Sequence, residues 1–230
     1  MRTFFVWITM LTFVSLIHQN SIAQNFVKVE AIFQNEPLEL GKSYFFNTEK
    51  DCVKIEILKF YLSDFSLWNN KVLVFKSTQL PVLIDLKKPE SKILPLELPN
   101  NLTFNTIKFN LGIDSLTNVS GAFGGDLDPT NGMYWTWQSG YINFKIEGTS
   151  SISPARKNIF QYHLGGYLAP YYGLREIKLP VSNPETIHII LNLSSFFEYV
   201  ASKEIYQVMS PNQKAMYVAD EIAKLFSVQL

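Results

Sequence analysis

Cysteine is almost absent from this sequence, because Cys52 carries the only thiol in 230 residues. A chain with one cysteine has no intrachain disulfide and no cysteine pair at metal-ligand spacing, so its stability depends on a packed core. Histidine is scarce as well. Beyond residue 23 only His163 and His188 remain, so a metal site in this chain has few imidazole groups available.

Net charge is also missing. Lys and Arg total 20, Asp and Glu total 20, and the formal net charge is zero. Without a basic excess or a Lys/Arg patch, nucleic acid is excluded as an expected partner. The sequence has no H-E-x-x-H, no Walker loop and no Gly-x-Ser-x-Gly motif. We therefore expect no enzyme; a hydrolase would need an acid or base beside a histidine in a cleft.

The N-terminus carries the one apolar run of note. Arg2 precedes the apolar segment Phe4–Ile17, and Ser21-Ile22-Ala23 places small residues at −3 and −1. This pattern predicts a signal peptide over residues 1–23 with cleavage after Ala23. The run is shorter than the roughly 18–20 residues of a membrane span. We expect residues 24–230 to form one exported domain without a membrane span, in the periplasm, in the cell envelope or secreted.

Alternation of apolar and polar residues, typical of β-strands, dominates the rest of the chain. It predicts strands over Val27–Phe33, Ser43–Phe46, 52–68 (one strand or two), Lys71–Lys76, Pro81–Leu86, Ile93–Leu98, Leu102–Ile113, Met133–Gly148 (one long strand bent near Gly140), Asn158–Leu164, Leu174–Leu179 and Thr186–Leu193. Because no helices intervene, the spacing predicts a mainly β fold, a two-layer antiparallel β-sandwich.

The C-terminus changes to helical periodicity. Ser210, Pro211 and Gln213 fit the N-cap, first and third positions of a capping box. Apolar residues then recur at helical spacing from Ala215 to Leu225, which predicts an amphipathic helix packed on the sandwich. A shorter helix is expected over Ser195–Val200.

A long loop from Asp114 to Gly132 interrupts the strands, and loops of this length are often functional. Closely spaced carboxylates of Asp126 and Asp128, with Asp114 at the start of the loop, suggest a hard cation such as calcium. The spacing does not fit an EF-hand. The preferred interpretation is that Asp128 and Asn131 cap turns and that Gly132 adopts a positive φ.

Trp135 and Trp137 follow this loop in the segment Met133–Gln138. On a strand, residues i and i+2 project from the same face, so the two indoles should lie side by side. Paired large rings most often belong to a core. Their position directly after the long loop leaves a binding surface as the alternative.

The segment Phe160–Tyr167 contains His163 followed by Gly165 and Gly166. Gln161 and His163 should face one side of a strand, with Phe160 and its alternating neighbours on the other. A lone histidine on a strand is more often structural than a ligand.

Several blocks of this sequence together resemble the methanobactin-associated copper-binding protein family, the MbnP-like proteins. The blocks are Lys59–Ser63, Leu111–Ser115, Leu127–Pro129, Gly132–Tyr141, Phe160–Gly166, Met209–Pro211 and Ala219–Phe226. The resemblance covers nearly the whole chain after residue 23. The Trp-x-Trp and Tyr-x-His-Leu-Gly-Gly type blocks, here Trp135–Trp137 and Phe160–Gly166, are its most specific parts.

The resemblance implies a periplasmic β-sandwich that binds one copper ion and in which a di-haem partner of the MauG-like type oxidises a tryptophan to kynurenine. By position, Trp135 or Trp137 would be the modified or ligand-supporting residue. His163 would be the leading copper ligand and Met209 a soft thioether ligand, with His188 as the other imidazole. Imidazole and thioether donors suit Cu(I).

A second hypothesis is an envelope-binding module without a metal. In that case the long loop and Trp135, Trp137, Tyr141 and Tyr167 would form an exposed aromatic groove for a sugar or a peptide. The copper hypothesis instead predicts that His163 approaches a methionine sulfur beside the tryptophans.

Overall fold

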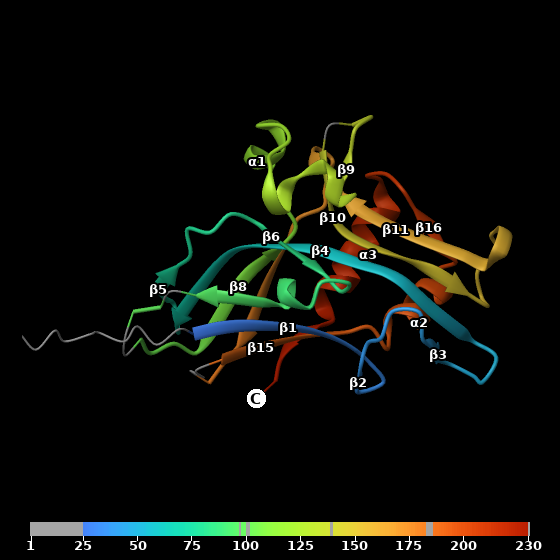
Figure 1. Ribbon diagram of the computed structural model, residues 1–230, viewed down its shortest axis with the longest axis horizontal. Helices are drawn as coiled ribbons and strands as arrows, with labels where there is room; N and C mark the ends of the chain where they lie inside the picture. The colour runs from blue at the N-terminus through green and yellow to red at the C-terminus, as the bar shows by residue number, and fades with distance from the viewer. Residues whose placement is uncertain (1–24, 97, 100–101, 139, 183–185, 230) are drawn as a thin grey trace, which may run out of the picture.

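The computed structural model describes residues 25–229 except 97, 100–101, 139 and 183–185 (Figure 1). The predicted signal peptide, residues 1–23, and its cleavage position lie outside the described residues. None of the helices in the described part of the chain has the length and apolar character that crossing a bilayer requires.

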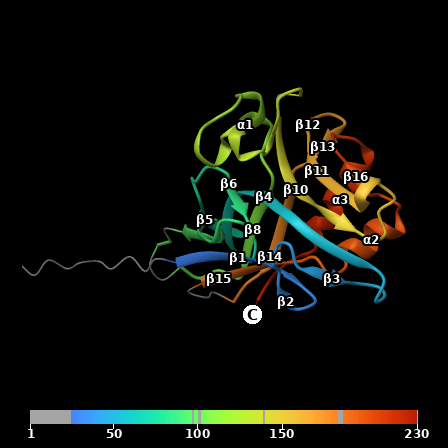
Figure 2. The same cartoon turned by 45° about the vertical axis from the view of Figure 1, so that its right-hand side comes forward.

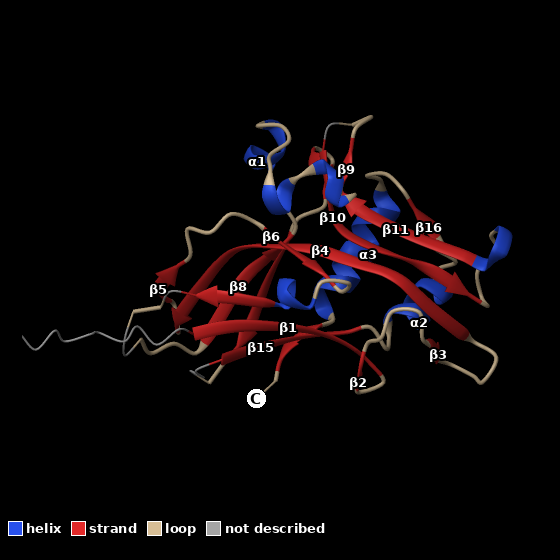
Figure 3. Cartoon of the chain, in the orientation of Figure 1, coloured by secondary structure: helices blue, strands red, loops and turns tan. Residues whose placement is uncertain are grey.

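The fold is mainly β, as the strand pattern predicts, and most of its strands belong to two large sheets (Figure 3). The strands are β1 (Asn25–Phe33), β2 (Glu36–Pro37), β3 (Ser43–Phe45), β4 (Cys52–Asn69), β5 (Val72–Lys76), β6 (Val82–Asp85), β7 (Ile93–Leu96), β8 (Thr106–Leu111), β9 (Tyr134–Trp135), β10 (Gly140–Ser150), β11 (Ile159–Gly165), β12 (Tyr167–Leu168), β13 (Tyr171–Tyr172), β14 (Arg175–Pro180), β15 (Thr186–Asn192), β16 (Gln207–Val208) and β17 (Phe226–Val228). The segment predicted as one strand or two over 52–68 is the single long strand β4.

The smaller of the two sheets has the order β17-β15-β1-β2, with β7 also paired to β1. The larger sheet has the order β14-β8-β4-β10-β11-β16, and β3, β5 and β6 pair with β4 while β9 pairs with β10. Figure 1 shows β1 and β15 lying beneath β4 and β8. Two pairings, β1 with β15 and β11 with β16, are parallel, a departure from the predicted antiparallel arrangement.

One core fills the space between the two sheets. Residues such as Val29 and Ile189 from the smaller sheet and Phe109 from the larger belong to the same buried cluster. Phe226 of β17 joins the layers, since its ring lies 5.9 Å from Phe60 and 5.8 Å from Phe109, in edge-on contact with both. Each such ring contributes about 1.5–3 kcal/mol by leaving water.

The helices are α1 (Ser115–Val119), α2 (Phe196–Ser202) and α3 (Gln213–Lys224), with the short 3₁₀ turns η1 (Pro89–Lys92), η2 (Gly125–Leu127), η3 (Pro129–Asn131) and η4 (Arg156–Asn158). The predicted amphipathic helix is α3, whose apolar face joins the core. Its N-cap is Asn212 and not Ser210. The Asn212 side chain accepts a hydrogen bond from the Ala215 backbone N–H at 2.9 Å, so the helix begins two residues later than a capping box at Ser210 would require.

The long loop folds onto the outward face of the larger sheet and forms a second buried cluster there. That cluster contains Tyr61, Leu83, Ile113, Leu127, Met133, Trp135, Tyr141 and Ile142. The Tyr141 hydroxyl donates to the Leu127 carbonyl at 2.9 Å and accepts from the Phe123 N–H at 3.0 Å. These bonds hold the loop against β10, beside the strand that carries His163.

Candidate functional site

His163 lies on the outward face of β11, away from the main core. Its neighbours Tyr162 and Leu164 point into the core cluster, so His163 and Gly165 alternate to the other side of the strand. His163 is nonetheless only 7% exposed, and its ring contacts Glu147 of the neighbouring strand β10. The predicted division of this strand into two faces is confirmed.

A carboxylate holds the imidazole. His163 Nε2 lies 2.5 Å from Glu147 Oε1, and Lys145 Nζ lies 3.2 Å from the same oxygen. The hydrogen bond from His163 lowers the pKa of Glu147 to about 2, against the opposing effect of burial and with help from the Lys145 charge. An ionised carboxylate only accepts hydrogen bonds, so Nε2 carries the hydrogen and neutral His163 has its lone pair on Nδ1.

Met209 directly follows β16, the strand that pairs with β11. Strands β11 and β16 run parallel and pair Tyr162 with Val208, and Met209 is the next residue. Val208 is buried, so Met209 alternates outward, where it is 41% exposed. The chain stays close to β11 beyond this point: a Cβ on the glycine after β11 would lie 3.0 Å from Pro211 Cβ. The thioether and the imidazole therefore share one face of the sheet.

Trp135 covers the same face one step further along β11. A Cβ placed on Gly165 would lie 2.7 Å from Cζ3 of the Trp135 indole, so only a glycine allows this contact. Because Gly165 and His163 point to the same side of β11, the indole and the imidazole are neighbours on that face.

The predicted single strand Met133–Gly148 is wrong. Its first part, β9, ends at Trp135, the chain turns over residues 136–138, and β10 returns antiparallel with Gly140 opposite Trp135. Trp137 consequently lies in a hairpin turn, 65% exposed, while Trp135 is 6% exposed. The indoles remain neighbours, with ring centroids 5.9 Å apart.

His188 lies elsewhere. It sits on β15 in the smaller sheet, between Ile187 and Ile189, which are buried in the core. His188 thus faces outward from one sheet and His163 outward from the other, with the core between them. The structure does not bring the two histidines together.

The loop carboxylates do not converge on one point. Asp114 caps α1 by accepting hydrogen bonds from the Thr117 N–H at 2.9 Å and hydroxyl at 2.7 Å, and these bonds lower its pKa although burial opposes them. Asp128 caps η3 through Thr130, whose hydroxyl and N–H also lower the Asp128 pKa. Gly132 adopts φ 72°. The predicted turn-capping role is confirmed for Asp128.

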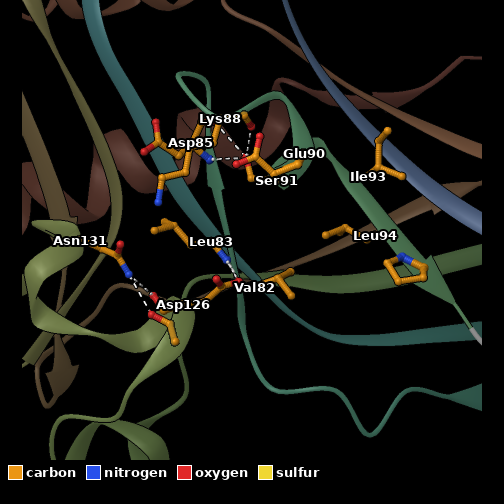
Figure 4. Close-up of a pocket in the computed structure, with 12 residues that line it drawn as sticks. Val82, Leu83, Asp85, Lys88, Glu90, Ser91, Ile93, Leu94, Asp126 and Asn131 are labelled. Carbon is orange, nitrogen blue, oxygen red and sulfur yellow. Dashed lines mark hydrogen bonds between the residues drawn. The ribbon is translucent and has the colours of Figure 1, made fainter.

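Asp126 is also engaged, at the edge of a cleft of about 360 Å³ between β6, β7 and the loop (Figure 4). Its Oδ2 accepts the Leu83 N–H at 2.9 Å. Across the cleft Asp85 pairs with Lys59 at 2.9 Å, and Asn131 donates to backbone carbonyls of the loop. Asp126, Asp85 and Asn131 thus each already have a protein partner at this cleft.

Comparison with known proteins agrees with this architecture. The MbnP family model matches residues 24–214. The chain belongs to the MbnP family. The solved structure of MbnP from Methylosinus trichosporium superposes with a TM-score of 0.55 and 16% sequence identity, covering 76% of this chain and 77% of that one. At this identity the likeness shows a shared fold. A search of curated proteins gave no significant match.

The donor set of this MbnP-family chain fits a soft, low-coordinate metal site better than a hard one. Within the described residues, no three or more His, Cys, Asp or Glu side chains gather where they could hold a metal ion. The outward face of β11 instead offers the His163 Nδ1 lone pair and the Met209 thioether. Imidazole and thioether suit copper, and thioether favours its reduced form.

The alternative hypothesis predicts that four aromatic rings are exposed beside the long loop. Trp135 and Tyr141 are buried, Tyr167 is half-buried, and of the four rings only Trp137 is exposed. The acid that a histidine-based hydrolase would require near His163 is present as Glu147, in a half-buried cluster with Lys145.

Glu147 is the residue that sequence reasoning missed. Its signal lay in the sequence of β10, where Lys145 and Glu147 are the only charged residues. In the pairing of β10 with β11, Lys145 stands opposite His163 and Glu147 opposite Gln161. The pairing register of β10 with β11 cannot be predicted from the spacing of residues along the chain, so the contact between Glu147 and His163 was not expected.

Proposed function

We propose that this chain is an exported copper-binding protein rather than an enzyme, and that it holds one copper ion on the outward face of β11. His163 supplies Nδ1 as the principal ligand and Met209 supplies its thioether. The observation that supports this most directly is the Glu147–His163 pair. Metal-bound histidines commonly donate their other ring N–H to a carboxylate, which fixes the ring and leaves the opposite nitrogen for the metal.

Two further observations support the assignment. Membership of the MbnP family makes a methanobactin-associated, copper-related role the leading expectation. Export is supported by the signal-peptide pattern over residues 1–23 and by the family match, which begins at residue 24. Periplasm or cell envelope is the location that we propose.

The copper proposal is tested by titrating the purified chain, residues 24–230, with Cu(I) in the presence of a competing chelator. We expect one copper ion per chain. His163→Gln, which keeps a donor for Glu147, and Met209→Leu should each weaken binding. His188→Ala is the matched control, because His188 lies on the other sheet. Unchanged affinity in His163→Gln would contradict the proposal.

We further propose that Trp137 is the tryptophan open to oxidation to kynurenine by a di-haem partner of the MauG-like type. Its exposure in the hairpin turn supports this choice over Trp135, which packs on Gly165. The test is the intact mass after co-expression with such an oxidase. Kynurenine formation replaces one carbon by one oxygen, and Trp137→Phe should abolish that shift while Trp135→Phe retains it. The reverse pattern would assign the oxidation to Trp135.

A further inference from the structure

A hollow of about 520 Å³ lies between α2 and α3, outside the copper site. Figure 2 shows the two helices side by side. The hollow is lined by the end of α2, by the segment that follows α2 and by the first turns of α3. The lining residues are Tyr199, Lys203, Ile205, Lys214 and Tyr217. This volume falls in the range of small-molecule sites, about 300–1,000 Å³.

The floor of the hollow is held in place by hydrogen bonds. Ile205, which is buried, donates its N–H to the Val200 carbonyl at 2.9 Å and thereby closes the end of α2. Its own carbonyl accepts the Tyr162 hydroxyl at 2.6 Å, which ties the segment to β11. A floor fixed by such bonds does not have to be ordered when a ligand binds, which favours affinity.

The charges around the hollow are unbalanced. No ion pair or side-chain hydrogen bond is formed by Lys203 or Lys214 with any described residue, and no acid belongs to the lining. The acidic residues further along α3 are already paired: Glu221 with Lys224 at 3.0 Å, and Asp220 with Arg175. Burial and the charges of Glu221 and Asp220 raise the pKa of Tyr199, so acids also lie near this hollow. The two ammonium groups on its border still have no described ion-pair partner, and such groups attract an anion.

The rest of the lining consists of two aromatic rings and one aliphatic side chain. Tyr199 and Tyr217 contribute aromatic rings from adjacent helices, and Ile205 contributes an aliphatic surface. Tyr217 is exposed although it belongs to the helix that packs on the core. Tyrosine combines an apolar ring with a hydroxyl, so such a surface accepts a flat apolar body and can still reach a polar group.

We propose that this hollow binds a small organic anion with a flat apolar body, its acidic group between Lys203 and Lys214 and its body on Tyr199, Tyr217 and Ile205. The site goes beyond copper binding. It is built from α2 and α3, and none of its lining residues contributes to the His163 cluster. Failure of either proposal therefore leaves the other standing.

The test is isothermal titration of metal-free protein with three probes: 2-naphthoate, its neutral amide analogue 2-naphthamide, and inorganic phosphate. We expect 2-naphthoate to bind at one site per chain with an affinity that falls as salt rises. The neutral analogue should bind more weakly because it has no charge for the two lysines. Phosphate should bind more weakly because it has no apolar body to pack on the tyrosines.

The double variant Lys203→Gln/Lys214→Gln should weaken 2-naphthoate by about tenfold, the size expected for two exposed charge contacts. Tyr217→Ala should weaken it as well. Lys76→Gln is the control, since Lys76 lies on β5, outside the lining of the hollow, and pairs with Asp64 at 2.8 Å. Thermal melting checks that each variant is folded. No binding of 2-naphthoate at millimolar concentration, equal binding of 2-naphthamide, or unchanged affinity in the double variant would each overturn the proposal.

Discussion

Glu147 fixes the tautomer of His163. The two residues come from neighbouring strands, β10 and β11, and their side chains meet at 2.5 Å on the outward face of the larger sheet. Lys145 approaches the same carboxylate oxygen, so the charge on Glu147 is stabilised from two sides. Nε2 therefore carries the hydrogen that Glu147 accepts, and Nδ1 is the ring nitrogen that a metal would bind.

Removing the Glu147 charge should loosen this arrangement. We expect Glu147→Gln to lower Cu(I) affinity by about 10- to 100-fold, the usual effect of losing a carboxylate behind a metal-bound histidine. Chelator competition measures the change. Glu56→Gln provides the control, because Glu56 pairs with a lysine on an exposed part of β4. Equal affinities in both variants would mean that Glu147 has no part in binding.

The lowered pKa of Glu147 makes the stability of the fold depend on pH. The folded pKa of Glu147 is about 2, below its ordinary 4.5, so its ionised form stabilises the fold above pH 4.5. That contribution is lost as pH falls from 4.5 to 2. The free-energy difference between wild type and Glu147→Gln, about 1 kcal/mol for a partly solvated contact, should be constant near pH 7 and shrink across this window. Urea unfolding at several pH values measures it, and a gap that widens on acidification would contradict the assignment.

The N-cap of α3 was predicted at Ser210 but lies at Asn212, and two substitutions distinguish these positions. Asn212→Ala removes the side-chain bond to the Ala215 N–H and should cost about 1 kcal/mol. Ser210→Ala should have little effect, although the motif at Ser210 resembles a capping box. Thermal or urea unfolding distinguishes the two variants. A larger loss in Ser210→Ala would restore the original prediction.

Local pattern predicted most of the strands because alternation depends on neighbours a few residues apart. β5, β6 and β15 lie within the predicted ranges, with their ends moved by a residue or two. The strands β2, β12, β13, β16 and β17 were missed, because none is longer than three residues and such short strands have no period to detect. Parallel pairing was missed for a different reason: partner choice is set by the packed core and not by the strand's own residues.

The candidate site was predictable in part. His163, Met209 and the tryptophans were named from the sequence, and the structure places them on or beside one face. What spacing did not predict was the hairpin turn that exposes Trp137. The segment after Trp135 alternates much as a strand does, and the reversal depends on tertiary contacts, including the packing of Trp135 on Gly165.

The Trp135 indole packs directly on Gly165. A methyl group at residue 165 would meet the Tyr141 carbonyl oxygen at 2.5 Å and Trp135 Cζ3 at 2.7 Å. The φ of Gly165 is not in the left-handed region, so the cost of Gly165→Ala is steric. We expect a loss of about 1–3 kcal/mol in the free energy of unfolding, with a changed near-ultraviolet circular dichroism signal as the indole moves.

Gly124→Ala is the matched control, because a Cβ there meets nothing within 4 Å and its φ is −91°. Its effect should stay within about 0.5 kcal/mol. If Trp135 lies over the copper-binding face as the structure places it, Gly165→Ala should also weaken Cu(I) binding, while Gly124→Ala leaves it intact. A destabilised Gly165→Ala variant with unchanged copper affinity would separate the indole from the metal site, because the displaced ring would then have left the His163 and Met209 donors undisturbed.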